Sequence, residues 1–390
     1  MLKAKISNHN FGTYFNPYTL KFSNDDLLVI NKYTQKHPNN PQKLKIYFGN
    51  ACNFRCKYCR QNQHNKKEEF SKNKCDEFIK KIKNNIIEWW GGEPLLYWQE
   101  ILYLTEKLGI DFTHHMTTNG SLLNENIVQF ILDHDFIFKL SHDGPLNFLR
   151  TYDVLKNDKF IHKIYNAKID KQQFYINSVY TNSKIRISDI VDYFINVFDD
   201  RVQIMKIEPV IPYNEWSSEY NIELDLQEFS KNLEEDLLYT DIMNHVQEYM
   251  MMYRIFVKNY NNPRYRYNPF EAKCIDTQNT TLSITFDGII TPCQVWDSNS
   301  AGILGSIDDF KNINELPPYT VSTKNRCNNC PVISLCRGTC PYIKESFNDN
   351  LNCKTRFFTY KAMLKAFMFK YLDFYISDID GDYFYKNEKW

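Results

Sequence analysis

The placement of cysteine constrains this chain more than any other feature of its sequence. Of eleven cysteines, ten fall into two groups, one between residues 52 and 59 and one between residues 274 and 353. The chain begins Met-Leu-Lys-Ala-Lys-Ile-Ser, with no apolar signal segment. Clustered cysteines in a reducing compartment bind metal more often than they form disulfides. The sequence therefore predicts a cytoplasmic protein that holds metal.

Composition narrows the range of functions further. The 390 residues carry 47 Lys and Arg against 47 Asp and Glu, so no net field attracts the chain to a polyanion or an anionic membrane. No uncharged apolar stretch of about 18 residues occurs, as a membrane-spanning helix would require. With 43% hydrophobic residues, the chain can bury a large core. We expect a globular protein with no nucleic-acid partner and no membrane span.

From Leu44 onward, short apolar runs alternate with longer helical patterns, which is typical of βα units around a parallel sheet. The expected strands are Leu44–Gly49, Ile86–Trp90, Phe112–Thr117, Phe136–Ser141, Phe174–Tyr180 and Val202–Glu208. The expected helices between them include Glu77–Lys83, Gln99–Leu108, Asn124–His134 and Ser188–Phe198, the last with a Ser N-cap. The fold class predicted is α/β, a partial (β/α)6 TIM-like barrel with a small irregular C-terminal domain.

The pattern changes after Glu208, and this gives the expected division of the chain. Leu224–Lys258 indicates one or two helices, the cysteine-rich stretch that follows has weak periodicity, and Thr355–Ile376 is again helical. The predicted segments are an N-terminal extension (1–43), the partial barrel (44–215), connecting helices (216–268), the metal-organised module (269–355) and a C-terminal helix and tail (356–390).

The first cysteine group directly follows the first strand, as Cys52-Asn-Phe-Arg-Cys56-Lys-Tyr-Cys59. This places three thiolates at the carboxyl end of the barrel, where such folds carry out chemistry. Three cysteines can hold three irons of a 4Fe–4S cluster and leave the fourth iron open to a ligand. The alternative is a zinc loop, but zinc normally takes four ligands and the next His or Cys is His64.

The CxxxCxxC spacing, with Tyr58 before the last cysteine, resembles the radical S-adenosylmethionine (SAM) superfamily. The resemblance implies that the open iron chelates the methionyl end of SAM and that Tyr58 lies near the adenine. It also implies that the Gly-Gly-Glu-Pro motif after the second strand receives the methionyl ammonium, since glycines permit close approach and a carboxylate pairs with a cation. The implied cofactor residues are Tyr58, Gly91, Gly92, Glu93, Pro94, Thr118, Asn119, Ser141, Asp143 and Arg150.

Successive side chains of a strand point to opposite faces of the sheet, and this distinguishes the residues at the end of the fourth strand. Ser141 and Asp143 share one face and His142 points to the other. We therefore assign Ser141 to the ribose or carboxylate side of the cofactor and expect His142 to be non-catalytic. By resemblance, Arg150 pairs with the cofactor carboxylate, although the spacing to the strand is shorter here than in relatives.

The second group has seven cysteines and matches the SPASM extension of radical SAM enzymes that modify peptides and proteins. By this resemblance Cys327, Cys330, Cys336 and Cys353 ligate one auxiliary 4Fe–4S cluster, and Cys274, Cys293 and Cys340 ligate another. The cluster of Cys274, Cys293 and Cys340 has either an iron without a protein ligand or a fourth ligand that is not cysteine, such as Glu271. A pair of zinc ribbons is the alternative that Cys327–Cys340 alone would allow. Cys75 remains as a reduced thiol.

The implied activity is that of a radical SAM oxidoreductase with three 4Fe–4S clusters. A reductant such as flavodoxin or ferredoxin supplies an electron, SAM splits into methionine and a 5′-deoxyadenosyl radical, and this radical takes hydrogen from an unactivated carbon. The expected substrate is a peptide or protein side chain, as in maturation of ribosomally made peptides by crosslinking, thioether formation or oxidation. Tyr260–Tyr267, rich in aromatics and Arg, is a candidate peptide contact.

Three alternatives remain open. A sulfatase-maturase activity is disfavoured because relatives carry an acidic residue directly after the cysteine matching Cys293, where this chain has Gln294. A radical enzyme for a sugar or an amino acid would need a closed pocket rather than a groove. A non-catalytic iron–sulfur electron carrier would explain the cysteines but not the Gly-Gly-Glu-Pro motif. The bond formed, any general base and the oligomeric state are not indicated by the sequence.

Overall fold

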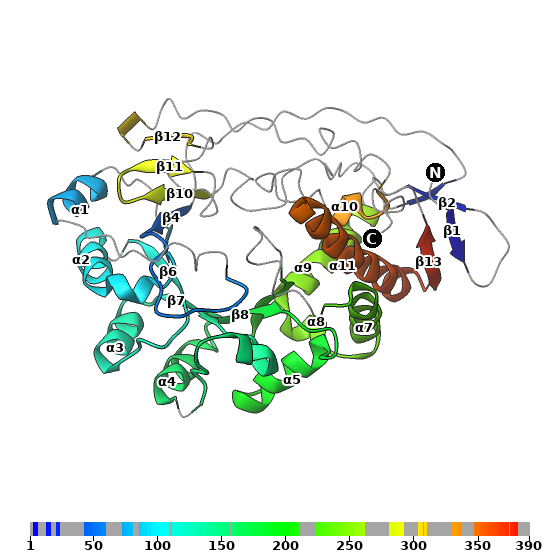
Figure 1. Ribbon diagram of the computed structural model, residues 1–390, viewed down its shortest axis with the longest axis horizontal. Helices are drawn as coiled ribbons and strands as arrows, with labels where there is room; N and C mark the ends of the chain where they lie inside the picture. The colour runs from blue at the N-terminus through cyan, green and yellow to red at the C-terminus, as the bar shows by residue number, and fades with distance from the viewer. Residues whose placement is uncertain are drawn as a thin grey trace.

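The computed structural model of the chain describes residues 3–6, 13–16, 21–23, 43–59, 72–80, 86–109, 111–156, 158–210, 224–261, 281–291, 303–306, 308–309, 330–336, 347–373 and 375–380. A nine-stranded sheet in the order β12-β11-β10-β4-β5-β6-β7-β8-β9 organises this part of the protein. Helices α1 to α5 form an arc around its strands (Figure 1).

Six neighbouring strands of this sheet run parallel and follow one another in chain order. They are β4 (Lys43–Tyr47), β5 (Ile86–Trp90), β6 (Thr113–Thr118), β7 (Ile137–Ser141), β8 (Phe174–Tyr180) and β9 (Ile204–Pro209). All six expected strands are present near their predicted bounds. The prediction of an α/β fold with a partial parallel barrel is confirmed.

The two faces of the parallel strands differ in chemistry. Along β8, buried and half-buried residues alternate from Phe174 to Tyr180, as a strand with one covered face requires. The buried set packs against the helices and is mostly apolar and aromatic; for example, the His114 ring stacks with Trp89 and Phe136, with ring centroids 5.7 and 5.0 Å away. The opposite set, here called the inner face, is largely polar.

Five described helices lie between the strands, and two of them, α3 and α4, begin at a side-chain cap. The five are α1 (Lys72–Ile79), α2 (Trp98–Leu108), α3 (Glu125–Asp133), α4 (Lys159–Lys168) and α5 (Ile187–Val197). The Asn124 side chain accepts from the Ile127 N–H at the start of α3. The expected Ser N-cap of α5 is wrong: Arg186 is the N-cap, and the Ser188 N–H donates to Asp236 instead.

Three strands that the sequence did not suggest extend the sheet beyond β4. β10 (Thr281–Thr285) pairs in parallel with β4, and β11 (Ile289–Thr291) and β12 (Gly305–Ser306) continue in antiparallel fashion. The cysteine-rich module therefore contributes regular structure to the barrel sheet. This pairing satisfies the N–H and C=O groups that β4 would otherwise expose at an edge.

A second group of helices packs beside β9. It consists of α7 (Leu226–Tyr239), α8 (Ile242–His245), α9 (Gln247–Asn261), the short α10 (Ile333–Cys336) and α11 (Phe347–Leu372). α7 and α11 are joined by an ion pair between Glu234 and Lys365 (2.6 Å) and by the Ser230 hydroxyl, which donates to the Phe358 carbonyl (2.9 Å). α11 begins earlier than the expected Thr355, so it crosses the expected domain boundary and carries Cys353.

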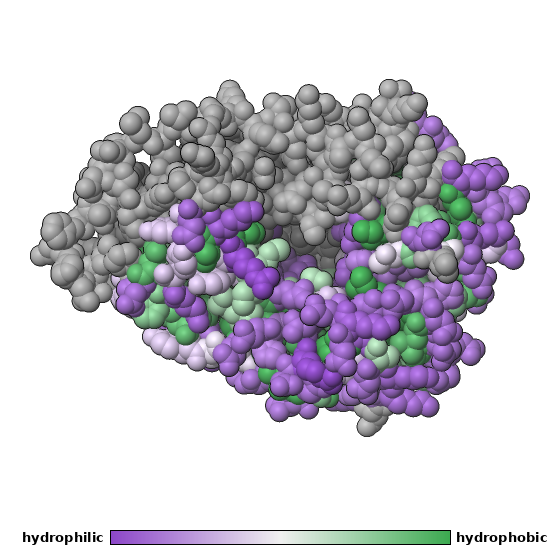
Figure 2. Space-filling view, turned by 180° about the vertical axis from the view of Figure 1, so that it is seen from behind, coloured by the Kyte–Doolittle hydropathy of each residue, from purple (hydrophilic) through white to green (hydrophobic). Residues whose placement is uncertain are grey.

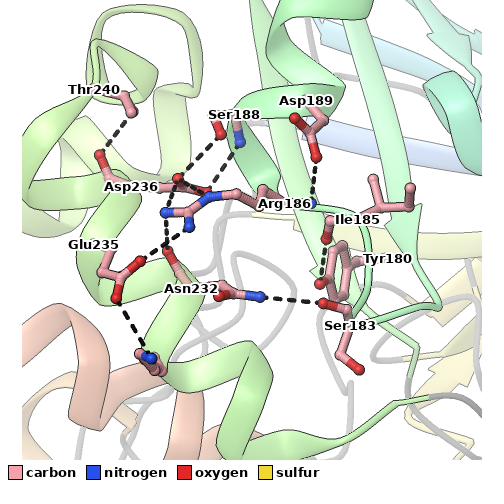
Figure 3. A network of polar contacts seen from close by, with 11 residues as sticks. Tyr180, Ser183, Ile185, Arg186, Ser188, Asp189, Asn232, Glu235, Asp236 and Thr240 are labelled. Carbon is pink, nitrogen blue, oxygen red and sulfur yellow. Dashed lines mark hydrogen bonds and ion pairs between the residues drawn. The ribbon is translucent and has the colours of Figure 1, made fainter.

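A buried carboxylate joins the barrel to this second group of helices. Asp236 of α7 is fully buried and accepts from Arg186 through Nε (2.9 Å) and Nη2 (2.7 Å). It also accepts from the Ser188 hydroxyl and backbone N–H at the start of α5 (Figure 3). Removing one partner of such a pair leaves a buried charge uncompensated. The contact therefore fixes α7, and through it α11, against the barrel.

The two ends of the chain form a separate small sheet. β13 (Ile376–Asp380), which follows α11, pairs with β1 (Lys3–Ile6), and β2 (Thr13–Asn16) and β3 (Lys21–Ser23) complete the sheet. Within the described residues, no helix combines the length and apolar character needed to cross a membrane. Seen from behind, the described surface is mostly hydrophilic, with hydrophobic residues in smaller groups (Figure 2).

Candidate active site at the carboxyl edge of the sheet

The cysteine loop, residues 51–59, follows β4 and extends across the carboxyl edge of the sheet. The Lys57 N–H donates to the Leu149 carbonyl beyond β7 (3.0 Å). Since β5 and β6 lie between β4 and β7, the loop passes the ends of both strands. Within the loop, the Cys59 N–H donates to the Cys56 carbonyl (3.0 Å) and the Phe54 N–H to Cys52 Sγ (3.3 Å). The three cysteines predicted as metal ligands thus lie on one braced loop.

Burial shapes the chemistry of these thiols. It raises the pKa of Cys52 to about 11 and that of Cys56 to about 12. Metal binding must therefore displace protons from the loop. Among the described residues, no three His, Cys, Asp or Glu side chains converge on the position of a single ion. Cysteines of a 4Fe–4S cluster bind separate irons at different corners, so the loop fits that ligand without such convergence.

The Gly-Gly-Glu-Pro segment lies against the start of the cysteine loop. The Gly92 N–H donates to the Gly49 carbonyl (3.0 Å), and the Glu93 N–H to the Ala51 carbonyl (2.8 Å). A Cβ atom on Gly92 would lie 2.3 Å from the Ala51 oxygen and 2.5 Å from the Asn50 oxygen. No side chain fits there, so glycine is required for this close approach of two backbones.

Glu93 is the central carboxyl of this edge. Its side chain is buried and accepts from Thr118 Oγ1 (2.6 Å), the Asn119 N–H (2.8 Å) and the Leu95 N–H (3.0 Å). Burial nonetheless raises the pKa of Glu93 to about 7, against the lowering by these hydrogen bonds. A carboxyl in this state gains from a nearby cation, because the cation favours the ionised form. Pro94 follows as the first residue of the 3-10 helix η2 (Pro94–Tyr97).

Asn119 connects the end of β6 to the cysteine loop. Its Nδ2 donates to Asn53 Oδ1 (3.0 Å) and lies 4.0 Å from Cys52 Sγ. Its Oδ1 accepts from the Ser121 N–H (2.9 Å), and Asn53 Nδ2 donates to Ser121 Oγ (2.8 Å). Thr118 and Asn119, predicted from the turn after the third strand, therefore both contact Glu93, and Asn119 also lies next to Cys52.

Tyr58, Asp143 and Arg150 form a second group at the edge. Arg150 donates to Asp143 through Nε (2.8 Å) and Nη2 (3.0 Å), and the Tyr58 hydroxyl donates to the same carboxylate. The guanidinium also lies over the Tyr58 ring, 5.8 Å from its centroid. Arg150 was expected to pair with a cofactor carboxylate, but it is paired with Asp143 here. Asp143 uses Nε and Nη2 and does not use Nη1.

Ser141 and His142 lie on opposite faces of β7, as alternation predicts. His142 is fully buried on the helix side, where its Nε2 bonds Asp153 Oδ1 (2.9 Å) and its Nδ1 accepts from the Gly144 N–H (3.0 Å). Ser141 is half-buried on the inner face, opposite Asn177 of β8. The packing gives His142 a structural environment and leaves Ser141 at the edge with the other predicted residues.

The sequence reasoning missed the polar inner face below this edge. Within the described part of the chain, four of its side chains carry a buried polar atom without a hydrogen-bond partner: Trp90 Nε1, His115 Nδ1, Thr117 Oγ1 and Asn177 Oδ1. Polar residues at every second position of adjacent predicted strands were the available signal. Buried polar groups are normally paired, so this face has the character of a surface completed by a ligand.

An ion-paired group lies on the same face. Glu88 is buried and bonds Lys139 (2.7 Å) and Lys43 (2.6 Å). Burial alone would raise the pKa of Glu88, but Lys139, Lys45 and Lys43 hold it well below its usual range. Burial and the same lysines lower the pKa of His115 to about 3, so His115 is neutral at physiological pH.

The second cysteine group is described only in part. Cys336 is buried at the end of α10, Cys330 is half-buried just before that helix, and Cys353 lies on α11. α10 contacts α11, so three of the four cysteines expected to share one auxiliary cluster lie on neighbouring elements. Cys274, Cys293, Cys327 and Cys340 fall outside the described residues, as do Glu271 and Gln294.

Comparison with known proteins places these observations in a family. The model of the radical SAM superfamily matches residues 46–203. The radical SAM cyclopropyl synthase TigE of Paramaledivibacter caminithermalis is 25% identical over 340 residues, covering 76% of this chain and 67% of TigE. A cysteine-type anaerobic sulfatase-maturating enzyme of Clostridium perfringens strain 13 is 24% identical over 344 residues, covering 77% and 88%.

Solved structures share the fold. The structure of anSMEcpe with bound AdoMet and Cp18Cys peptide superposes with a TM-score of 0.59 at 21% identity, covering 82% of this chain and 97% of that one. Streptococcus suis SuiB bound to its precursor peptide SuiA gives 0.53 at 18% identity, covering 80% and 75%. At these identities the likeness concerns the fold alone.

Proposed function

Since the chain belongs to the radical SAM superfamily and is an enzyme of the kind related to peptide and protein maturases, we propose that it modifies a side chain of a peptide or protein substrate. Cys52, Cys56 and Cys59 ligate three irons of a 4Fe–4S cluster. The cluster with SAM supplies a 5′-deoxyadenosyl radical, which abstracts a substrate hydrogen. The protein itself orients the cofactor and excludes water.

The observation that carries this proposal is the convergence of independently predicted residues on one edge of the sheet. The cysteine loop, Gly92 and Glu93 after β5, and Asn119 after β6 contact one another directly. A set of ordinary βα turns has no need of a buried carboxyl between them. Burial of an acid costs free energy, so its presence beside three thiols favours a cationic ligand.

Each residue of the edge then has a role in holding SAM. Glu93, with its raised pKa, accepts the methionyl ammonium, and Thr118 and Asn119 orient its carboxylate. Asp143 holds the Arg150 guanidinium in place, so that Nη1 is directed to the cofactor carboxylate. Tyr58 contacts the adenine from the loop, and Ser141 donates to the ribose or carboxylate side. Gly91 and Pro94 shape the backbone around Glu93.

The substrate approaches from the inner face. Trp90, Thr117 and Asn177 offer polar atoms without partners there, and a peptide backbone carries matching amide donors and acceptors in alternation. Two of the similar structures contain peptides by their descriptions, Cp18Cys and SuiA. These observations favour a peptide chain over a small molecule. The reaction belongs to the crosslinking, thioether-forming or oxidising class seen in ribosomal peptide maturation.

Two auxiliary 4Fe–4S clusters complete the proposal. Cys327, Cys330, Cys336 and Cys353 hold one, and Cys274, Cys293 and Cys340 hold the other. Support comes from the neighbouring positions of α10 and α11. Clusters held by these cysteines would supply an acceptor for the electron that the substrate gives up on oxidation. The enzyme works in the cytoplasm with a one-electron donor such as flavodoxin or ferredoxin.

Sulfatase maturation is the second candidate. The match to the cysteine-type sulfatase-maturating enzyme of Clostridium perfringens covers 88% of that protein, which favours a shared substrate class. The residue after Cys293, acidic in such relatives, is Gln294 here. Formation of formylglycine in a sulfatase-derived Cys peptide, measured by mass spectrometry, distinguishes this candidate from the leading one.

The test of the cluster assignment is replacement of Cys52, Cys56 and Cys59 by Ala. We expect loss of 5′-deoxyadenosine formation under dithionite by at least about 1,000-fold, because SAM then has no iron to chelate and the barrier rises by more than about 4 kcal/mol. Cys75→Ala is the matched control, since Cys75 is buried on α1 and belongs to neither predicted group. Full activity in the triple variant would disprove the assignment.

A further inference from the structure

An exposed surface beside the cysteine loop combines two aromatic rings with positive charge. It consists of Arg55 and Lys57 of the loop, Phe148 of the 3-10 helix η3 (Gly144–Leu149), and Tyr152 and Lys156 just after it. The Phe148 and Tyr152 side chains are 65% and 56% exposed. We call these five residues the loop–η3 surface.

Backbone contacts make this surface continuous and fix its shape. The Lys57 N–H donates to the Leu149 carbonyl (3.0 Å), and the Arg55 N–H donates to the Thr151 hydroxyl. The residues between Phe148 and Tyr152 are therefore held directly against the loop that carries the cysteines. A rigid exposed surface loses little entropy when a partner docks.

The cations of this surface are balanced only in part within the described structure, since the hydrogen bond to His142 and, to a smaller extent, the charge of Lys156 lower the pKa of Asp153. Arg55, Lys57 and Lys156 make no ion pair with any described carboxylate; the Arg55 Nη1 group instead donates to the carbonyls of Cys52 (2.7 Å) and Phe54 (2.9 Å). The nearby Asp153 is bonded to His142. In a chain with no net charge, three cations and two exposed aromatics on two segments that are bonded to each other give this region a positive and aromatic character.

The position of this surface relative to the cluster is its second distinguishing property. Lys57 directly follows Cys56 in the chain and precedes Cys59 by two positions. A protein seated on Phe148 and Lys57 would therefore bring its own redox group close to the cluster ligands. Electron transfer rates fall steeply with distance, so this location suits delivery of an electron better than recognition of a substrate that must reach the inner face.

We propose that the loop–η3 surface is the docking site for a small acidic one-electron carrier protein, a flavodoxin or a ferredoxin, that reduces the cluster. This inference rests on the proposed cluster at Cys52, Cys56 and Cys59 but on no particular substrate. One electron passes from the reduced carrier to the oxidised cluster for each SAM cleaved, and the carrier leaves oxidised by one electron. Charge complementarity speeds the encounter, and the aromatics supply the contact area.

The carrier would bind weakly and release quickly. Redox complexes use small interfaces, below about 1,200 Å² in total. A surface of five residues, two of them aromatic, is suited to an interface of this small size. The positive side chains attract an acidic partner in a salt-dependent manner. We therefore expect the rate with a carrier protein, at low carrier concentration, to fall as ionic strength rises.

The test compares two electron sources in the full-length, cluster-loaded enzyme. The variants are Phe148→Ala with Tyr152→Ala, and Lys57→Glu with Lys156→Glu. Formation of 5′-deoxyadenosine is measured with limiting reduced flavodoxin and, separately, with dithionite, which is small and needs no docking site. We expect each double variant to lose about tenfold with flavodoxin, the effect of a contact worth about 1.4 kcal/mol, and to keep its dithionite rate.

Matched controls come from α7, on the far side of β9 from the cysteine loop. Tyr239→Ala removes an exposed ring, and Lys231→Glu reverses an exposed charge. Neither is expected to change the flavodoxin rate. If the loop–η3 variants behave like these controls with flavodoxin, or lose activity equally with both reductants, the docking inference is wrong.

Direct binding separates this inference from the proposed function. Titration of 15N-labelled oxidised flavodoxin with the enzyme, followed by NMR, reports docking without SAM chemistry. We expect binding by the unaltered protein and about tenfold weaker binding by both double variants. Unaltered binding in the variants would overturn the docking site. Absence of 5′-deoxyadenosine from the unaltered enzyme with dithionite would instead overturn the proposed function.

Discussion

The carboxyl edge and the inner face of the same sheet treat buried polar groups in opposite ways. At the edge, Glu93 accepts three hydrogen bonds and Asp143 receives Arg150, Tyr58 and the Val179 N–H. On the inner face, polar atoms of Trp90, Thr117 and Asn177 have no hydrogen-bond partner among the residues that the structure describes. Both regions belong to the same six strands and the turns after them, and at the edge the backbone N–H groups of Leu95, Asn119 and Val179 supply part of the hydrogen bonds.

This difference indicates which part of the proposed site has its polar groups paired before a ligand binds. Groups that already satisfy one another hold a fixed geometry, which suits a cofactor that is the same in every reaction cycle. Groups left without partners carry a cost of about 1–3 kcal/mol each, which a ligand can remove. We infer that the edge is organised for SAM and that the inner face is completed by the substrate.

The largest effect is expected from Gly92→Ala at the edge. The new methyl group would lie 2.3 Å from the Ala51 oxygen, so either the Gly-Gly-Glu-Pro segment or the cysteine loop must move. A displacement of about 1 Å in an oriented site can cost about 100-fold in rate. We therefore expect at least this loss of 5′-deoxyadenosine formation, measured under dithionite.

Gly109→Ala is the matched control for this change. Gly109 also has a special backbone, with φ of +81°, but no atom lies within 4 Å of its added Cβ. With ψ of −172°, Gly109 lies in a backbone region that only glycine readily occupies, so the control should cost about 1–3 kcal/mol in unfolding free energy and leave SAM cleavage unchanged. Equal activity of the two variants would show that the close backbone approach at Gly92 is not needed for SAM cleavage. The proposed contrast between an edge of fixed geometry and an inner face with unpaired polar groups would then not hold.

A smaller effect is expected from Glu93→Gln, which tests the edge through its pH dependence. The pKa of Glu93 is raised to about 7 by burial, so the carboxyl takes up a proton as the pH falls below about 7. If Glu93 receives the methionyl ammonium in its ionised form, as proposed, the dissociation constant for SAM should rise up to tenfold per pH unit below that point. The measurement is SAM binding to cluster-loaded protein between pH 6 and 8.

The Gln variant should lose affinity and this pH dependence together. A charge-assisted hydrogen bond is worth about 1.5–3 kcal/mol, so we expect about 10- to 100-fold weaker binding at pH 8 and a flat profile. Glu125→Gln, at the exposed start of α3, should retain the original profile. If the Gln variant keeps the slope below pH 7, another group is titrating and Glu93 does not receive the ammonium.

The sequence predicted the edge well because its residues are adjacent in motifs. Gly92 and Glu93 follow one strand, and Thr118 and Asn119 follow the next. Since the carboxyl ends of parallel strands meet at one edge, placing the strands was sufficient to bring these residues together. The motif could not reveal that Asp143 engages Arg150, because that contact depends on the path of η3 after β7.

The inner face and the added strands were harder to predict because they depend on long-range pairing. Asn177 joins the inner face through the register of β8 against β7, which spacing along the chain does not specify. β10 and β11 had a local signal, Asp287-Gly288 between two β-branched runs, with Gly288 at φ of +76°. That signal indicates a hairpin, but nothing local indicates that β10 pairs with β4, far earlier in the chain.

Two neighbouring threonines on β6 give the sharpest form of the comparison. Thr118 is buried, and its Oγ1 donates to Glu93 (2.6 Å) and accepts from the Gly120 N–H (3.0 Å). Thr117 points to the inner face, where no described residue forms a hydrogen bond with its Oγ1. Replacement of either by Val removes one hydroxyl and keeps the branched shape, so the two variants differ only in what the hydroxyl contacts.

We expect Thr118→Val to lower the unfolding free energy by about 1–3 kcal/mol, because a buried N–H and a buried carboxylate each lose a partner. Thr117→Val should change it by about 0.5 kcal/mol or less, or raise it, since an unpaired buried hydroxyl is replaced by a methyl group. Denaturant unfolding of the metal-free protein measures both. Substrate binding is expected to depend on the other threonine. In the cluster-loaded enzyme, Thr117→Val should raise the KM for the peptide substrate while leaving SAM binding unchanged. Equal destabilisation by the two substitutions would mean that the inner-face hydroxyl already has a partner, and the distinction between a completed edge and an open inner face would not hold.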